Sequence, residues 1–136
     1  MNRKDFQELS KVRLKEAKAL LDLGHFDGAY YLAGYAVECA LKACIAKGTQ
    51  RHDFPDKRRV DLSHTHNLKE LVRVAGLEAA FDSACNNREF SKKWEYVRGW
   101  SEQSRYQRHG EESARALILA VGDLNQGVIA CIKPHY

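Results

Sequence analysis

Residues 27–47, DGAYYLAGYAVECALKACIAK, limit what this chain can fold into more than any other stretch. Plotted at 100° per residue, alanines recur at alternating spacings of four and three, so a neighbouring helix can approach closely along this seam. The seam consists of Ala29, Ala33, Ala36, Ala40 and Ala43, and the bulky apolar side chains beside it are Tyr30, Val37, Leu41 and Cys44. A helix that is apolar on almost every side is expected at the centre of a helical bundle.

The same helix is expected to carry one polar stripe opposite the alanine seam. Within an arc of roughly 60° it holds Tyr31, Tyr35, Glu38 and Lys42. Glu38 and Lys42 are four residues apart in the order that favours an ion pair, so the stripe could be a partly exposed pair beside two tyrosines. Alternatively, it lines a cleft or a two-fold interface, where these side chains could bind a ligand.

Length and composition fit a helical domain that needs no metal or disulfide to hold its core. The sequence has 136 residues and a net charge of +4, and we predict a single domain over residues 1–136. This mildly basic balance permits contact with nucleic acid but does not require it. The four cysteines form no CxxC pair and we find no secretory leader, so we expect reduced thiols and a cytoplasmic protein. The only candidate membrane span, residues 28–46, carries Glu38 and Lys42, which argues against a membrane role.

Helical periodicity also precedes the central stretch. Residues 4–23 form an amphipathic pattern, and Gly24 followed by Asp27 as a cap predicts a short turn and an antiparallel hairpin. Arg13 projects from the middle of the apolar side of this first helix, where a guanidinium needs an acidic partner. Glu38 is one candidate for that partner.

The second half of the sequence alternates between helical patterns and interruptions. Residues 49–66 lack an apolar period, contain Pro55 and are dense in both charge signs, so we expect a long charged loop. The helices predicted after it are 67–75, capped by Thr65 and ended by Gly76, then 77–85 and 90–97, and a last long helix over 111–132 with Leu124 inward and Asn125 at or inside its apolar side. No strand-like alternation appears. We therefore predict an all-α fold, an antiparallel up-and-down four-helix bundle with one or two additional short helices.

Cations and aromatic rings interleave over residues 98–110, RGWSEQSRYQRHG. The side chains concerned are Arg98, Trp100, Arg105, Tyr106, Arg108 and His109. Such a segment is commonly a solvated connection. Alternatively, Arg105 and Arg108 hold phosphate, Tyr106 or Trp100 stacks a base, and His109 supplies a proton. RNA could then be cleaved by its own 2′-hydroxyl group without a metal.

The six histidines do not form a recognisable metal motif. His64 and His66 are two residues apart, so they cannot share a helical face, and no cysteine lies nearby to complete a zinc site. We also find no glycine-rich phosphate loop and no nucleophile elbow. The sequence therefore predicts neither a metal site nor a cofactor.

Three segments together resemble the HEPN domain family. They are LLDLGHFDGAYYLAGYAVECALKACIA, then THNLKEL, then SRYQ before a last amphipathic helix, and the resemblance extends over residues 4–132. It implies a bundle of four or five helices, frequent homodimerisation, and a role in toxin–antitoxin pairs, often beside a nucleotidyltransferase. Many relatives are metal-independent ribonucleases, and others bind nucleotides or act as non-catalytic modules.

The ribonuclease members of this family place an arginine four to six residues before a histidine, near the start of the last long helix. Here Arg105 and His109 have three residues between them, so His109 is rotated by about 100° from the usual position. Arg58 and Arg59 fit the spacing to His64, but they lie outside the part of the chain where the family has its motif. Glu38 matches the polar position on the second helix.

The combined hypothesis is a cytoplasmic, homodimeric HEPN-type module that binds RNA or nucleotide phosphate and has a nucleotidyltransferase partner. Its cleft would use Tyr31, Tyr35, Lys42, Arg98, Trp100, Tyr106 and Arg108 for binding. One alternative is a metal-independent endoribonuclease toxin, in which Arg105 holds the scissile phosphate, His109 is the general acid or base, and Glu38 orients one of them. Another alternative is a structural dimerisation domain without catalytic activity.

Overall fold

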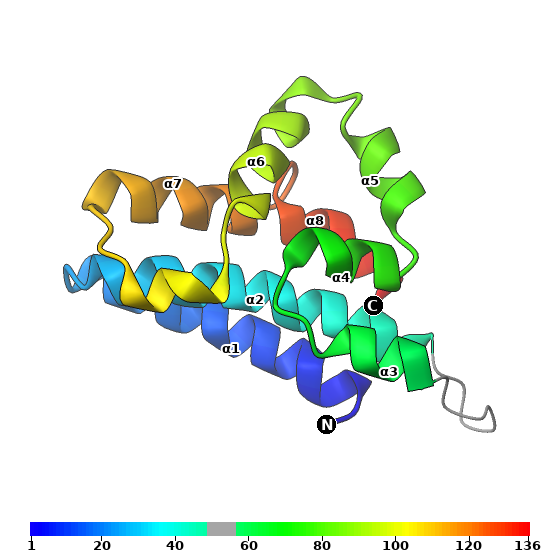
Figure 1. The fold of residues 1–136 in the computed structure, drawn as a ribbon. Helices are drawn as coiled ribbons and strands as arrows, with labels where there is room; N and C mark the ends of the chain where they lie inside the picture. The colour runs from blue at the N-terminus through cyan, green and yellow to red at the C-terminus, as the bar shows by residue number, and fades with distance from the viewer. Residues whose placement is uncertain (49–56) are drawn as a thin grey trace.

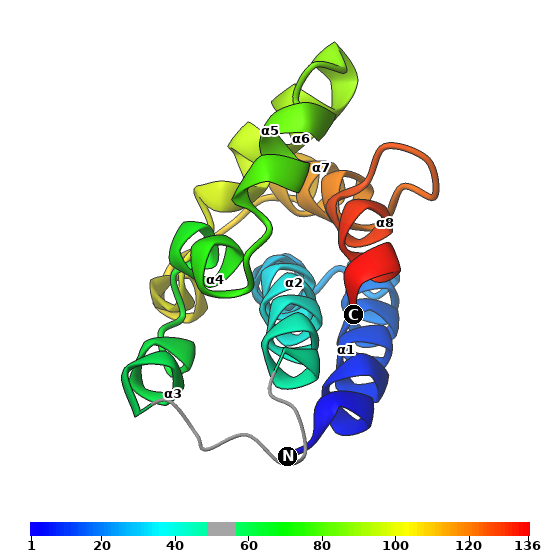
Figure 2. The same cartoon turned by 90° about the vertical axis from the view of Figure 1, so that its right-hand side faces the viewer.

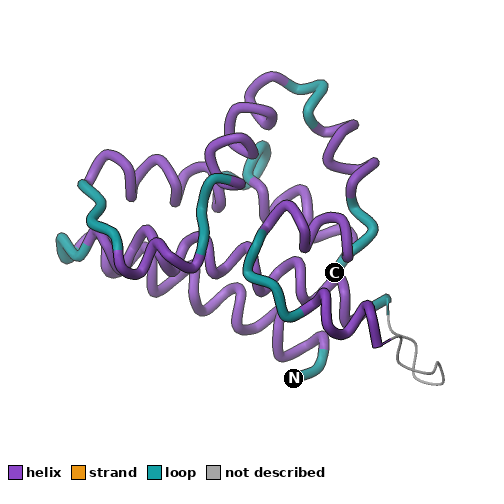
Figure 3. The backbone as a smooth tube through the Cα atoms, in the orientation of Figure 1, coloured by secondary structure: helices purple, strands orange, loops and turns teal. Residues whose placement is uncertain are grey.

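The computed structural model describes residues 1–48 and 57–136, with the backbone alone for residues 57–59. Its helices are α1 (Arg3–Asp22), α2 (Phe26–Lys47), α3 (Lys57–Ser63), α4 (Leu68–Val74), α5 (Glu78–Ala84), α6 (Arg88–Arg98), α7 (Glu111–Gly122) and α8 (Val128–Ile132), with short 3-10 helices η1 (Glu102–Tyr106) and η2 (Lys133–His135). None of the described residues is in a strand (Figure 3), which confirms the all-α class.

The first two helices form the predicted antiparallel hairpin (Figure 1). Gly24 ends the turn of α1 with a φ of 81°, a left-handed conformation that glycine adopts without steric cost. The predicted cap of α2 is wrong by two residues. His25 occupies the N-cap position without a side-chain hydrogen bond, and the Asp27 carboxylate, within the first turn, accepts the backbone N–H of His109.

Helix α2 is the central element of the fold, as its composition predicts. It contacts α1, α4, η1, α7 and α8, and Figure 2 shows helices around it on several sides. All five alanines of the seam are fully buried. On that side α1 comes close enough for the Ser10 hydroxyl to donate to the Ala36 carbonyl oxygen at 2.8 Å. The seam therefore allows two backbones to approach each other.

Two predictions for the first half of the chain need correction. Lys57–Ser63 form helix α3, where a loop over residues 49–66 was expected; residues 49–56 lie outside the described part. Arg13 forms its ion pair with Glu16, one turn along its own helix, rather than with Glu38. Its side chain is about one-third exposed, so the guanidinium reaches the edge of the helix and needs no buried partner.

The last long helix is interrupted. Residues 123–127 separate α7 from α8, because the Asp123 carboxylate accepts the backbone N–H groups of Asn125 at 2.9 Å and Gln126 at 2.7 Å. Such local bonds compete with helical ones. Leu124 and Asn125 are consequently exposed, the former at 88%, although the apolar period placed Leu124 inside. Gly127 is required at the break, since a Cβ there would lie 2.3 Å from the Asp123 carbonyl oxygen.

The short helices between α3 and α7 begin and end at residues with clear local roles. Asn67 rather than Thr65 caps α4, its side chain accepting the Glu70 backbone N–H at 3.0 Å. Gly76, with a φ of 73°, follows the end of α4 as predicted. Asn87 caps α6. None of the described helices is long and apolar enough to cross a membrane.

The chain returns to α2 after α6 through the indole of Trp100. This ring is 2% exposed and packs flat on Gly34, where an added Cβ would lie 2.3 Å from three of its atoms. Its centroid is 5.8 Å from that of the Tyr31 ring. The absence of a side chain at Gly34 thus creates the slot that fixes η1 against α2.

We expect Gly34→Ala to destabilise the protein, because the new methyl group would displace the Trp100 indole. Overpacking of this kind costs about 1–3 kcal/mol, more than the gain of roughly 1 kcal/mol that alanine brings to a helix interior. The measurement is the urea midpoint followed by circular dichroism. Gly99→Ala is the control, since a Cβ there meets only the Tyr96 carbonyl oxygen at 3.4 Å. A Gly34→Ala protein as stable as the wild type would contradict this packing.

The cysteines of α2 are buried thiols. Burial, followed by the charge of Glu38, raises the pKa of Cys39 to about 12, and burial raises that of Cys44 to about 11. At pH 8 we expect both to resist a thiol-specific reagent in the folded protein, while Cys85, which is only partly buried, reacts first.

The raised pKa values of Cys39 and Cys44 also predict that the folded protein becomes less stable at alkaline pH. Above about pH 8.5 an unfolded chain loses its thiol protons, whereas the folded one retains those of Cys39 and Cys44. The free energy of unfolding should therefore fall as the pH rises, and less steeply in Cys39→Ala. Rapid modification of Cys39 in the native protein would argue against both expectations.

Candidate functional site

The polar stripe of α2 lies beneath the segment that leads into α4 and beneath η1. Glu38, at its centre, is 1% exposed. Its Oε1 accepts a hydrogen bond from Lys42 Nζ at 2.9 Å and lies 2.8 Å from His66 Nδ1. Its Oε2 is buried and has no hydrogen-bond partner. The predicted Glu38–Lys42 pair is therefore present, but it is mostly buried and has a third member.

That third member, His66, connects α2 to η1. Its other ring nitrogen, Nε2, lies 3.2 Å from Glu102 Oε2, and the same carboxylate oxygen lies 3.6 Å from Arg105 Nη2. We call the five residues Lys42, Glu38, His66, Glu102 and Arg105 the charge cluster. Nitrogen-bearing side chains and carboxylates alternate along it, so each carboxylate lies between two potential donors.

The charge cluster has a mostly buried end on α2 and a more exposed end at η1. The side chains of Lys42 and Glu38 are 17% and 1% exposed, whereas those of His66 and Arg105 are 44% and 48% exposed. Ion pairs at such exposed positions contribute about 0–1 kcal/mol each, so Glu102 is held weakly. A hollow of about 350 Å³ lies at this end, lined by Thr65, His66, Asn67, Trp100, Ser101, Glu102 and Gln103.

Tyrosine rings surround the exposed arginine. The Arg105 guanidinium carbon lies 5.9 Å from the centroid of Tyr31 and 5.3 Å from that of Tyr106, within the range of cation–π attraction. Tyr31 stacks in turn on Tyr35, with centroids 6.1 Å apart. Burial raises the pKa of Tyr31; Arg105 opposes this shift and Glu38 adds to it. The Tyr31 phenol therefore keeps its proton at neutral pH and can donate a hydrogen bond.

His109 lies in a different environment. Its ring stacks on Tyr30 with centroids 3.6 Å apart, and its Nε2 is buried without a partner. It borders a hollow of about 320 Å³ lined by Gly24, His25, Phe26, Asp27, Gly28 and His109. Tyr30 and Tyr31 point about 100° apart on α2. No hydrogen bond or ion pair joins the His109 side chain to Arg105 in the described part of the chain.

The other predicted binding residues divide into exposed and buried groups. Arg98, Arg108 and Tyr106 are exposed, the last at 74%, so Tyr106 is available to stack a base. Trp100, predicted as a second stacking ring, is instead a core side chain packed on Gly34. The correction has a physical reason, since an interleaved aromatic in a basic segment gains more by filling a slot in the core than by facing water.

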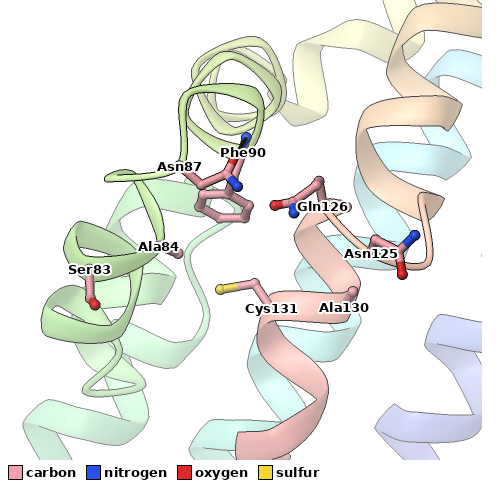
Figure 4. Close-up of a pocket in the computed structure, with 9 residues that line it drawn as sticks. Ser83, Ala84, Asn87, Phe90, Asn125, Gln126, Ala130 and Cys131 are labelled. Atoms are coloured by element: carbon pink, nitrogen blue, oxygen red, sulfur yellow. Dashed lines mark hydrogen bonds between the residues drawn. The ribbon is translucent and has the colours of Figure 1, made fainter.

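A separate hollow of about 280 Å³ lies between α5, α6 and α8 (Figure 4). Its lining includes the amides of Asn87 and Gln126 and the thiol of Cys131, and none of the predicted site residues. Burial and the neighbouring Cys85 raise the pKa of Cys131, so this thiol is a poor nucleophile. Over residues 1–48 and 57–136, no group of three or more His, Cys, Asp or Glu side chains is arranged to hold a metal ion.

Comparison with known families identifies the domain to which this geometry belongs. The model of the HEPN domain matches residues 5–124, which include the whole charge cluster. The chain belongs to the HEPN domain family. The resemblance seen in the sequence is thereby confirmed. Comparisons with curated proteins and with solved structures gave no match, so the roles of individual residues in this HEPN domain are argued from its own geometry.

Sequence reasoning missed two members of the charge cluster. His66 was weighed only as a metal ligand, and Glu102 was given no role. Glu38 and His66 are 28 residues apart in sequence, and no periodicity connects them. The available signal was the buried carboxylate itself, because Glu38 on an apolar helix requires more donors than Lys42 alone provides.

We expect Glu38→Gln to cost about 1–3 kcal/mol of stability, because Lys42 and His66 would lose the charge that both of them face. The measurement is the urea midpoint at pH 7. Glu70→Gln is the control, since the Glu70–Arg73 pair joins side chains that are 47% and 46% exposed, and should change stability by less than about 0.5 kcal/mol. Equal effects of the two substitutions would indicate that Glu38 is not buried.

Proposed function

We propose that this HEPN domain is a nucleotide- or RNA-phosphate-binding module, and that its ligand binds at the exposed end of the charge cluster. The observation that carries the proposal is the position of Arg105. Its guanidinium is about half exposed between the rings of Tyr31 and Tyr106. A cation beside aromatic faces matches the two parts of a nucleotide, the phosphate and the base.

The neighbouring groups favour an anionic, base-containing ligand. Arg98 and Arg108 are further exposed cations on the same segment, and they would attract the following phosphates of a single strand. Tyr106 offers a free ring face, since it is 74% exposed. Lys42 is engaged with Glu38, so in this proposal it acts through the charge cluster rather than by touching phosphate.

The biological setting belongs to the same proposal. HEPN domains are related to nucleotide and RNA chemistry and commonly dimerise, which supports a cytoplasmic homodimer in a toxin–antitoxin-like pair with a nucleotidyltransferase. The four longest helices, α1, α2, α6 and α7, are proposed as the counterparts of the up-and-down bundle. A nucleotidyltransferase gene beside this one, and co-purification of the two products, would support the pairing; a monomer that binds no such partner would overturn it.

Endoribonuclease activity is the second candidate, and the position of His109 beside a hollow of about 320 Å³ favours it. In this mechanism Arg105 would hold the scissile phosphate, His109 would move the proton, and Glu38 would orient the site. The ligand would have to extend from the Tyr31 side to the Tyr30 side of α2, or a second subunit would have to bring the two side chains together. Unchanged RNA cleavage and growth inhibition in His109→Ala would exclude this candidate.

We expect Arg105→Ala to weaken binding of a short fluorescent oligoadenylate about tenfold, because a charge-assisted contact to phosphate is lost. The slope of log affinity against log salt should fall by about one. The measurement is fluorescence anisotropy at several salt concentrations.

Arg115→Ala is the control for this experiment. Arg115 is an exposed arginine on α7 that pairs with Glu111 at 2.9 Å, so the variant removes the same charge away from the proposed site. If Arg105→Ala and Arg115→Ala weaken binding equally, the effect comes from the change in net charge alone. Absence of salt-dependent binding in the wild type would favour the third candidate, a structural dimerisation domain.

A further inference from the structure

We propose that Glu102 occupies the position of a ligand phosphate, and that His66 and Arg105 are the two groups that bind this phosphate once the Glu102 carboxylate moves away. The proposal rests on the proposed function and adds a residue, His66, that neither the family motif nor the basic segment supplies. It names the ligand as the phosphoryl group of a nucleotide.

The geometry of Glu102 carries the argument. A single oxygen, Oε2, lies 3.2 Å from His66 Nε2 and 3.6 Å from Arg105 Nη2. Two donors from different elements therefore converge on one point, and an anion is already there. A carboxylate and a phosphoryl group offer similar oxygens to such donors, but the phosphoryl group carries more charge and more acceptor oxygens. The long contacts and the partial exposure of Glu102 leave it easy to displace.

His66 is oriented for this role by the buried end of the cluster. Glu38 is 1% exposed and its Oε1 lies 2.8 Å from His66 Nδ1, which directs Nε2 towards η1. The charged groups that face His66 are Glu38 and Lys42 from α2, and Glu102 and Arg105 from η1. Because Nδ1 faces the Glu38 carboxylate, Nε2 is the ring nitrogen that faces the ligand. Glu38 is thus a positioning residue, and His66 is the residue that touches the ligand.

The arrangement explains why Glu38 keeps an oxygen without a donor. Oε2 is buried and lacks a partner, which costs stability in any fold. An amide at this position would also leave polar atoms buried without partners, and it would not face His66 with a carboxylate. The unpartnered oxygen therefore accompanies the carboxylate that orients His66.

The test compares Glu102→Gln with Glu8→Gln. Both variants remove one carboxylate from an exposed pair three residues apart, and the Glu8–Lys11 pair, at 3.5 Å, lies on α1, the helix that packs on the alanine seam opposite the stripe. The probes are 5′-AMP, which carries a phosphomonoester, and an oligoadenylate without terminal phosphate, which carries only diesters. We expect Glu102→Gln to bind one or both probes about three- to tenfold more tightly than Glu8→Gln does.

A second readout separates binding by His66 from a general gain of positive charge. His66→Gln in the Glu102→Gln background should remove the gain in affinity, because the second donor to the phosphate is lost. On addition of 5′-AMP, the NMR signal of the His66 ring should shift in the wild type.

The outcomes distinguish the inference from the proposed function. If Glu102→Gln binds more tightly and Glu8→Gln does not, the inference and the proposed function are both supported. This holds also where binding by the wild type is too weak to detect. If Arg105→Ala weakens binding but Glu102→Gln and Glu8→Gln bind the probes equally well, the inference is overturned. The proposed function then stands. If neither the wild type nor Glu102→Gln binds either probe, both are overturned.

Discussion

The structure depends on one buried carboxylate. Glu38 lies on the most enclosed helix of the fold and is removed from water almost completely, which is unfavourable unless donors surround it. Lys42, one turn along α2, provides the first donor. His66 provides the second, and it can do so only if the chain before α4 lies against α2. A single charge therefore fixes the path of residues far away in sequence.

The packing on either side of this charge follows from the size of the side chains on α2. Alanines on one side allow α1 to approach until Ser10 bonds to the α2 backbone. Gly34 receives the flat face of Trp100 on the other, and the indole in turn lies beside Tyr31. Because Trp100 lies two residues before the start of η1, the same slot that buries the indole brings Arg105 over the tyrosine stripe. The contact that packs Trp100 into the core therefore also positions the site.

Features with a local cause could be predicted from the sequence. The alanine seam, the turn at Gly24, and the end of α4 at Gly76 each depend on neighbours within one helical turn. The break after Gly122 could not be read from the apolar period, because Leu124 continues the helical spacing between Val121 and Val128. The helix is interrupted instead by bonds from the backbone N–H groups of Asn125 and Gln126 to the Asp123 carboxylate. His66 and Glu102 were missed for a different reason, since their importance arises only when α2, the segment before α4 and η1 meet around His66.

The N-terminal half of α2 presents different functional groups on its Tyr31 side and on its Tyr30 side. Tyr31 faces Arg105, which is exposed. The Glu102 carboxylate lies between Arg105 and the His66 imidazole. Tyr30 carries His109 stacked on its ring, with the backbone of His109 held by Asp27. The three residues between Arg105 and His109 therefore carry the chain from the Tyr31 side of α2 to the Tyr30 side. On the Arg105 side, the histidine that accompanies the arginine is His66, and it comes from the segment before α4 instead of the segment before α7.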